Sequence, residues 1–285
     1  MTFLHEQLAS GRERLVAAGI DPTAAAIDVD LFVRTILGWD RARVLTARAE
    51  PAPAGLEPRF SEWILRRARR EPAAYIVGNR EFWGLDFRVT SDVLIPRPES
   101  EFIVEESLAI LSLLELTSPR LADIGTGSGC LAVSLAHEIE GAHITATEVS
   151  STALTVARDN SRRLGVSSRV TFVETSFLDG IDGPFDLIAA NPPYVKDGDK
   201  PALSHDVRHE PDVALFGGET GLQGVEAVLD AAVRTLVSGG WLVMEFGFGQ
   251  EDDVRHLVAA RPALRMDRVR ADLQGIPRTA VIQRS

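Results

Sequence analysis

The stretch Leu121-Ala-Asp-Ile-Gly-Thr-Gly-Ser-Gly129 decides the fold of this chain, because an apolar strand runs directly into a glycine-rich turn. Glycines at this point permit a tight turn and a close approach of a ligand to the start of a helix. From here on, strand-like runs alternate with helical segments such as 151–164 and 224–236. We expect strands over residues 121–124, 143–148, 170–174, 187–190, 241–246, 264–270 and 279–283. The alternation predicts an α/β fold with a doubly wound, mainly parallel seven-stranded sheet and helices on both faces.

A second motif follows the apolar run 185–190 at once: Asn191-Pro192-Pro193-Tyr194. A strand that meets two prolines loses its hydrogen-bond donors, so the backbone must leave the sheet as a stiff, extended corner. We expect this corner to expose the Asn191 amide and the Pro192 carbonyl, with the Tyr194 ring as a wall. Two acceptors beside an aromatic ring suit a planar NH2 group, either an amide or an exocyclic amine of a base.

Composition and charge exclude several classes of protein. The 285 residues contain 45% hydrophobic residues and one cysteine, Cys130, so neither a disulfide framework nor a cysteine zinc site is expected. No apolar run reaches the length of a membrane span, and residues 1–7 lack the features of a secretory signal, so we expect a cytoplasmic protein without a membrane partner. The net charge of −11 argues against a general nucleic-acid binder.

The chain divides into three predicted parts. Residues 1–75 form a helical domain, residues 76–95 a connecting β-hairpin, and residues 96–285 the α/β domain. The first part holds 11 Arg against 10 acidic residues, a balance of +1, which leaves −12 for the rest of the chain. The arginines within 66–70 are interpreted as a solvated helix face or as a contact for RNA or an acidic partner. His205 and His209 are the only pair with a four-residue spacing, and we assign no metal.

The glycine turn is interpreted as a cofactor site formed by Gly125, Thr126, Gly127, Ser128 and Gly129. A dinucleotide fingerprint would need a third glycine at position 130, where this chain has cysteine. The spacing instead resembles the first motif of class I S-adenosylmethionine methyltransferases. Two further residues complete the prediction.

Glu148 ends the second strand, where a carboxylate can accept both hydroxyls of a ribose. Phe177 follows the third strand and could flank an adenine ring; packing in the core is the other interpretation. At the corner, Asn191 Oδ1 and the Pro192 carbonyl would hold a planar nitrogen toward a sulfonium methyl group, which is catalysis by orientation and electrostatics.

Together these residues resemble the HemK/PrmC family, the protein-(glutamine-N5) methyltransferases of class 1 peptide chain release factors. The similarity covers nearly the whole chain. It includes Glu71 to Gly78, Val93 to Glu99, Asp123 to Gly129, Asn191 to Tyr194, His209 to Pro211, Ala214 to Gly218, Glu245 to Gly247 with Gln250, and Asp272 to Gly275 with Arg278. Asn-Pro-Pro-Tyr alone is shared with DNA adenine and rRNA guanine methyltransferases, whereas its combination with Ile95-Pro-Arg-Pro-Glu99 is highly specific.

The resemblance implies a class I, Rossmann-like methyltransferase whose substrate is the glutamine of the Gly-Gly-Gln loop of a release factor. S-adenosyl-L-methionine would bind at Gly125 to Gly129, Glu148, Phe177 and Asn191, and the glutamine at Asn191, Pro192, Pro193 and Tyr194. The helical domain would help to dock the release factor. We expect a monomer with no direct contact to nucleic acid. Glu148, Phe177 and Ser100 stand where the family often has aspartate, tryptophan and threonine.

Three alternatives remain open. The first is the sister enzyme that methylates a glutamine of a large-subunit ribosomal protein, although its family usually differs at Ile95 to Glu99. The second is a DNA or rRNA base-amine methyltransferase, disfavoured by the charge of −12 beyond residue 75. The third is a binding module without catalysis, disfavoured because both halves of a methyl-transfer site are present. Fold alone would not separate them.

Overall fold

The computed structural model describes residues 2–285, and the contacts within the chain divide it into two units. The helical unit extends to Gly78 and includes Ser204–His209, a short segment from much later in the chain. The sheet unit comprises Asn79–Leu203 and Glu210–Ser285. No helix within residues 2–285 is both long and apolar enough to cross a membrane.

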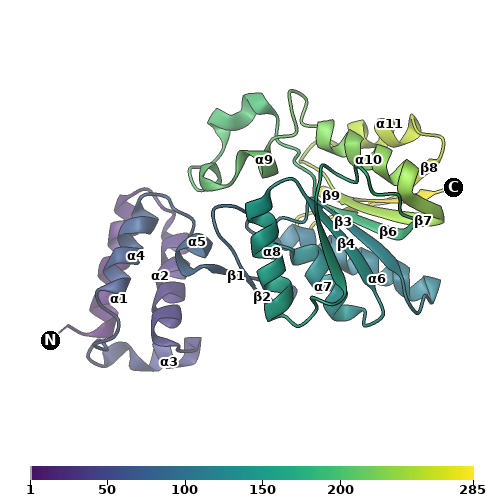
Figure 1. Ribbon diagram of the computed structural model, residues 1–285. Coiled ribbons are helices and arrows are strands. Elements are labelled where there is room, and N and C mark those ends of the chain that lie inside the picture. The colour runs from purple at the N-terminus through teal and green to yellow at the C-terminus, as the bar shows by residue number, and fades with distance from the viewer. Residues whose placement is uncertain (1) are drawn as a thin grey trace. The chain divides into compact units, whose positions relative to one another are not determined.

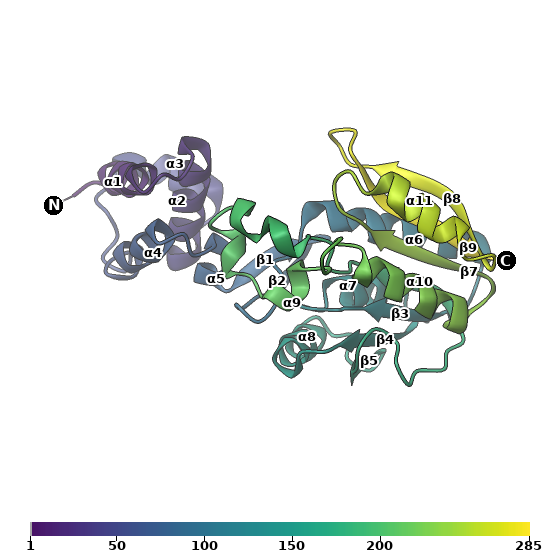
Figure 2. The same ribbon diagram turned by 90° about the horizontal axis from the view of Figure 1, so that it is seen from above.

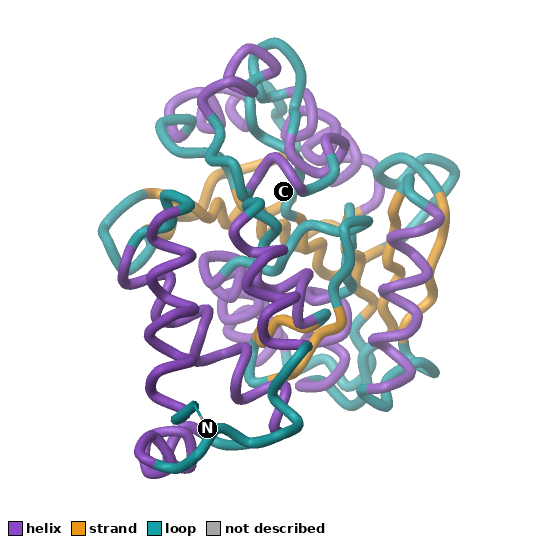
Figure 3. Tube along the Cα trace, turned by 90° about the vertical axis from the view of Figure 1, so that its left-hand side faces the viewer, coloured by secondary structure: helices purple, strands orange, loops and turns teal. Residues whose placement is uncertain are grey.

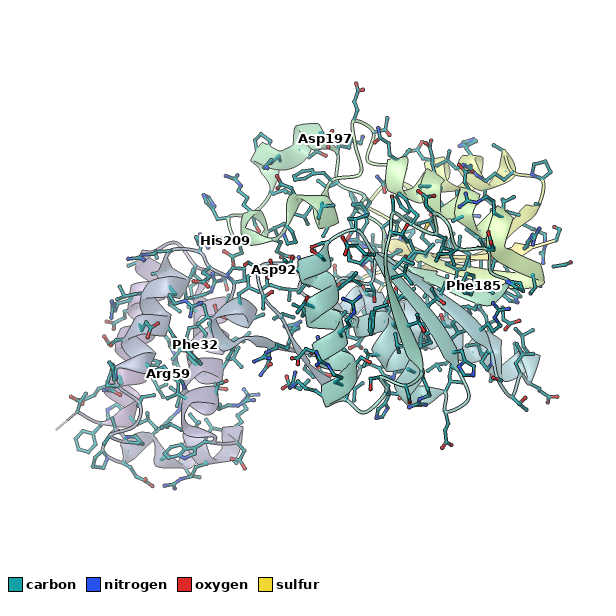
Figure 4. The ribbon with its side chains drawn as sticks, viewed as in Figure 1. Phe32, Arg59, Asp92, Phe185, Asp197 and His209 are labelled. Carbon is teal, nitrogen blue, oxygen red and sulfur yellow. The ribbon has the colours of Figure 1, made fainter. Side chains whose placement is uncertain are left out.

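The helical unit packs its amphipathic helices around one apolar core (Figure 1). Its helices are α1 (Leu4–Ala17), α2 (Pro22–Leu37), α3 (Arg41–Thr46), η1 (Ala47–Ala49), α4 (Arg59–Ala68), α5 (Ala73–Val77) and η4 (Val207–His209). Helix α2 begins as its sequence predicts, because the Asp21 side chain accepts hydrogen bonds from the backbone N–H groups of residues 23 and 24. Phe32 of α2, labelled in Figure 4, is fully buried and meets Trp63 edge to face at 5.4 Å.

The arginines of α4 are mostly held within the helical unit. Arg67 is 5% exposed and donates to Asp28 at 2.6 Å and to Asp206 at 2.7 Å. Arg66 pairs with Glu71, and Arg70 donates to the Gly19 carbonyl at 2.6 Å. The interpretation of residues 66–70 as a solvated basic face is therefore wrong for Arg67, which two carboxylates hold in the interior, whereas the side chains of Arg66 and Arg70 stay 34% and 29% exposed.

The connecting hairpin is shorter than the expected 76–95. Residues 73–77 form helix α5, which ends at Gly78 in the left-handed conformation (φ 81°). Strands β1 (Asn79–Phe82) and β2 (Leu85–Arg88) then pair antiparallel. Phe82 and Phe87 are buried together, and their T-shaped contact at 6.1 Å fixes the hairpin to the sheet unit.

The sheet unit is built on one seven-stranded sheet in the order β5-β4-β3-β6-β7-β9-β8. The strands are β3 (Arg120–Ile124), β4 (His143–Glu148), β5 (Val170–Glu174), β6 (Phe185–Ala190), β7 (Leu236–Glu245), β8 (Leu264–Ala271) and β9 (Pro277–Arg284). The first five pair in parallel, and β9 lies antiparallel between β7 and β8. These pairings confirm the predicted mainly parallel sheet, and its strands are orange in Figure 3.

Helices cover both faces of this sheet (Figure 2). Successive strand residues alternate between the two cores: Leu121 packs on one face, whereas Ala122 and Ile124 pack on the other. The first face carries α6 (Glu101–Leu114) and α7 (Cys130–Glu138), with α8 (Ser151–Arg163) beside α7; the second carries α10 (Gln223–Thr235) and α11 (Glu251–Ala259).

One predicted boundary is wrong. The sequence predicts a helix over 224–236 and a strand from 241, but α10 ends at Thr235 and β7 already begins at Leu236. The register between β6 and β7 shifts between Phe185 and Leu187, so residues 237–240 form a bulge. Gly239 adopts a φ of 80° there, which explains glycines inside a strand.

Candidate active site

The site lies where the sheet changes direction. From β3 the chain continues to β4 and β5 on one side and then returns to β6 on the other side, so the strand order reverses between β3 and β6. Ile124, the last residue of β3, is paired with Ala190, the last residue of β6. The glycine turn and the corner at Asn191 therefore leave the sheet side by side, at the carboxyl ends where doubly wound folds bind ligands.

A cavity of about 350 Å³ opens at this edge, within the size range of small-molecule sites. All of its lining residues belong to the sheet unit. They include Asp92, Val93, Gly125, Gly127, Glu148, Thr175, Phe177, Asn191, Pro192, Pro193, Val213, Phe216 and Gly217. Asp92, labelled in Figure 4, stands on the segment that follows the hairpin.

The glycine turn is held by its own glycines, by Asp123 just before it, and by the end of strand β4, where the Thr147 carbonyl accepts from the backbone N–H groups of Gly125 and Thr126. Gly125 and Gly127 have φ values of 72° and 53°, and a Cβ on either would meet no atom closer than 4.0 Å. A side chain there would enter the cavity instead. Asp123 is fully buried and accepts hydrogen bonds from Thr126 Oγ1 at 2.6 Å and from the backbone N–H of Ala132 at 3.0 Å. Burial raises the pKa of Asp123 to about 6.

Glu148 and Phe177 line the cavity as their sequence positions indicated. Glu148 Oε2 accepts from the Gly127 N–H at 3.1 Å, and Oε1 accepts from the next two backbone N–H groups. The carboxylate thus connects the end of β4 to the glycine turn. Phe177 adopts a φ of 47°, a strained conformation for an aromatic residue, and strain of this kind concentrates at functional sites.

Three other predicted cofactor residues do not line this cavity. Thr126 and Ser128 line a smaller adjoining hollow of about 40 Å³, together with Ser100 and Asn191. Gly129 lines neither space. It faces α8 instead, and a Cβ on it would lie 3.2 Å from the Ala157 side chain. Its smallness permits α8 to pack against the turn.

The corner is held by residues far away in sequence. Asn191 Nδ2 donates to Ser100 Oγ at 2.9 Å, and Ser100 Oγ donates to Glu245 Oε2 at 2.6 Å. Tyr194 lines neither space described here; its hydroxyl donates to Glu245 Oε1 at 3.1 Å. Burial is the largest cause that raises the pKa of both Tyr194 and Glu245. The expected ring wall is thus an anchored residue.

The backbone of the corner fits against glycines. A Cβ on Gly217 would lie 2.4 Å from the Pro193 carbonyl oxygen, and one on Gly221 would lie 2.5 Å from the Tyr194 carbonyl oxygen. Gln250 Nε2 donates to that same Tyr194 oxygen at 3.1 Å. Only glycines allow the loop after the corner to approach the backbone so closely.

Ser100, Glu245, Gly217 and Gln250 were not predicted as site residues. They fall in or beside the motifs shared with the family, but nothing in their local sequence indicates which atom they contact. Only the tertiary structure brings them to Asn191-Tyr194. Within residues 2–285, no group of three His, Cys, Asp or Glu side chains could hold a metal ion.

The arrangement can orient a planar amide beside a bound small molecule. Because Ser100 engages Nδ2 of Asn191, the Asn191 amide oxygen faces away from Ser100, where it can accept a hydrogen bond. Pro192 also lines the cavity, and its backbone carbonyl is a second possible acceptor at the corner.

The chain matches known families over most of its length. Residues 6–78 match the PrmC N-terminal domain, and residues 105–219 match the methyltransferase small domain. The chain is 39% identical to the release factor glutamine methyltransferase of Bradyrhizobium diazoefficiens, over 97% of this chain and 94% of that protein. It is 40% identical to the protein of the same name from Moorella thermoacetica, over 95% of both chains.

Solved structures share the fold. A methyltransferase from Pyrococcus furiosus is 20% identical, with a TM-score of 0.51 over 70% of this chain and 89% of that one. The N-terminal domain of human METTL16, in complex with SAH, is 18% identical, with a TM-score of 0.52 over 71% of this chain and 76% of that one. At this level of identity the similarity concerns the fold.

Proposed function

We propose, from the premise that this chain belongs to the family of release factor glutamine methyltransferases, that it methylates the side-chain amide N5 of the glutamine in the Gly-Gly-Gln motif of class 1 peptide chain release factors. The methyl donor is S-adenosylmethionine. The observation that supports the assignment most directly is the pairing of Ile124 with Ala190, which sets the glycine turn beside the Asn191 corner at one cavity.

The residues that line the cavity suit the cofactor. Gly125 and Gly127 leave open the space that side chains would fill, and both line the cavity. Glu148 supplies carboxylate oxygens suited to ribose hydroxyls, and Phe177 an aromatic face suited to adenine. When bound, the cofactor supplies an electrophilic methyl group on a sulfonium.

The corner residues act on the substrate amide. An amide nitrogen is a poor nucleophile because its lone pair is delocalised. Asn191 Oδ1 and the Pro192 carbonyl would accept hydrogen bonds from the two N–H groups of the glutamine amide. These two bonds would aim the amide nitrogen at the methyl group. The same acceptors stabilise the positive charge that grows on the NH2 group as the N–C bond forms. As that bond forms, the bond between the methyl group and sulfur would break and leave its electron pair on sulfur. The amide proton becomes acidic only at this point, so it can pass to solvent water and no strong base is needed.

The functional assignment is tested by offering candidate substrates in parallel. Purified release factor, large-subunit ribosomal protein and RNA would each be incubated with labelled S-adenosylmethionine. We expect label on the release factor alone, at the glutamine of Gly-Gly-Gln by mass spectrometry of the peptide. Label on the ribosomal protein would support the sister activity, and label on RNA but on no protein would overturn the proposal.

We also propose that the helical unit docks the intact release factor. A short Gly-Gly-Gln loop offers little surface, so the factor must be held elsewhere to orient its glutamine. The helical unit exposes large apolar side chains, among them Ile27 (63% exposed) and Leu65 (48% exposed). Exposed apolar groups of this kind suit a protein partner.

Docking is tested with surface variants of the full chain. Ile27→Glu and Leu65→Glu should raise KM for intact release factor while the rate on a Gly-Gly-Gln peptide stays unchanged. Leu113→Glu, at a position 83% exposed in the sheet unit, is the matched control. Equal KM values for all variants would remove the docking role. Sedimentation of the enzyme alone and a nucleic-acid binding assay would test the expected monomer and the expected lack of nucleic-acid binding.

A further inference from the structure

Glu245, the last residue of β7, is a buried carboxylate placed behind the corner. It is 2% exposed, and it accepts hydrogen bonds from two residues: Ser100 at 2.6 Å and Tyr194 at 3.1 Å. The proposed function so far uses neither Glu245 nor Ser100. A buried carboxylate is costly unless it is hydrogen-bonded, and both of these hydrogen bonds connect Glu245 to the residues around the Asn191 corner.

The direction of these hydrogen bonds can be worked out from the chemistry of the groups. A serine hydroxyl has one proton, and both carboxylate oxygens of Glu245 act as acceptors, Oε2 toward Ser100 and Oε1 toward Tyr194. Ser100 must therefore give its proton to Glu245, which leaves its oxygen to accept. The Asn191 side chain lies 2.9 Å from that oxygen, so the NH2 end of Asn191 must face Ser100. Its carbonyl end then faces the other way.

We propose that Glu245 and Ser100 are positioning residues that set which end of the Asn191 amide meets the substrate. This inference rests on the proposed function of Asn191. With the pair in place, Asn191 presents an acceptor to the substrate NH2 group. Without it, Asn191 can turn over and present its own NH2, and two donors then face each other. Asn191 donates to Ser100 and Ser100 donates to Glu245, so the carboxylate sets the direction of both hydrogen bonds.

The expected kinetic signature is a loss of kcat with little change in KM. Most of the affinity for a protein substrate comes from its remote surface, whereas the direction of one hydrogen bond acts at the reacting nitrogen. Loss of one oriented hydrogen bond corresponds to a decrease in rate of about 10-fold. Cofactor affinity and melting temperature should stay near those of the unmodified enzyme.

The test compares three single variants of the full chain with release factor as substrate. Ser100→Ala removes the hydroxyl and should lower kcat by about 10-fold. Ser100→Thr keeps a hydroxyl and should restore most of that loss. Ser107→Ala is the matched control, because Ser107 is fully buried in α6 and its hydroxyl has no hydrogen-bond partner within residues 2–285. It should leave kcat unchanged.

The outcomes separate this proposal from the function on which it rests. If the unmodified enzyme labels no release factor, the proposed function fails first. If it does label the factor, the positioning role is overturned by a kcat for Ser100→Ala within about twofold of the unmodified enzyme. It is also overturned if Ser100→Thr is as slow as Ser100→Ala, because packing and not the hydroxyl would then matter. A change confined to KM would overturn it as well.

Discussion

The glycine turn and the Asn191 corner leave neighbouring strands at the same edge, yet they are held in different ways. The turn keeps its shape through left-handed glycines and through hydrogen bonds whose partners lie between three and 32 residues apart in sequence, from Asp123 and Thr126 to Ser128 and Asn160. The corner is held by Ser100, 91 residues before Asn191, and by Glu245, 51 residues after Tyr194. The cofactor half of the site thus rests on consecutive elements of the chain, from β3 to α8, whereas the substrate half brings together segments from distant parts of the sheet unit.

This difference predicts that the two halves can be damaged separately. Changes in the turn should act on cofactor affinity, and changes at the corner should act on turnover with the cofactor bound. A variant of one half that behaves like a variant of the other would break the comparison.

The largest effect is expected for Asn191→Ala. The variant loses a fixed acceptor for the substrate amide, and loss of a preorganised polar contact costs on the order of 100-fold or more in rate. Cofactor affinity, measured by calorimetry, should fall far less, although Asn191 also lines the cavity. Turnover close to that of the unmodified enzyme would exclude Asn191 from the mechanism.

Gly127→Val should lower cofactor affinity by at least about 10-fold, because a branched side chain at φ 53° would both strain the backbone and enter the cavity. Gly165→Val is the matched control: Gly165 also has a positive φ of 75°, and a Cβ there meets nothing within 4 Å, but it lies outside the cavity. The control should lose stability without losing affinity. Calorimetry that shows unchanged affinity in folded Gly127→Val would contradict the cofactor site.

A smaller effect, a decrease in kcat of about 10-fold, is expected for Gly217→Ala. Its new Cβ would lie 2.4 Å from the Pro193 carbonyl oxygen and must displace the corner, while the glycine turn stays in place. Gly198→Ala, in the same loop, is the control, because a Cβ there meets nothing within 4 Å. Equal loss of cofactor affinity and kcat in Gly217→Ala would show that the two halves are not separate.

The same contrast explains what the sequence could predict. Strands β4 and β5 were predicted with their observed bounds, since they are short segments rich in Val, Ile and Thr between clear turn signals. The glycine turn was identifiable from the spacing of its glycines, and Glu148 from its position at the end of a strand. Leu236 was misassigned because its place in β7 depends on pairing with Phe185, which no local pattern reveals.

At the corner, the sequence indicated the motif but not its support. Tyr194 was expected to wall the slot because it follows two prolines, whereas its hydroxyl is held by Glu245. Arg67 was placed in a solvated cluster because its neighbours are charged, whereas Asp28 and Asp206 bury it. In both cases the unforeseen partner is distant in sequence, and such partners follow from tertiary packing alone.

The smallest effect on activity is expected for Asp123→Asn, which sharpens the comparison through stability. An asparagine oxygen can still accept from Thr126 and Ala132, so cofactor affinity should fall less than in Gly127→Val.

In the unmodified enzyme, burial raises the pKa of Asp123 to about 6 from an ordinary 3.8. The folded state therefore binds this proton more tightly than the unfolded state does, and this group makes the free energy of unfolding fall as pH rises from about 4 to about 6. Asp123→Asn removes that contribution, so the variant should gain stability relative to the unmodified enzyme over this range, by on the order of 1–3 kcal/mol. Urea unfolding of both proteins at several pH values measures the difference, and parallel curves between pH 4 and 7 would show that the Asp123 carboxylate is not buried in the way the turn requires.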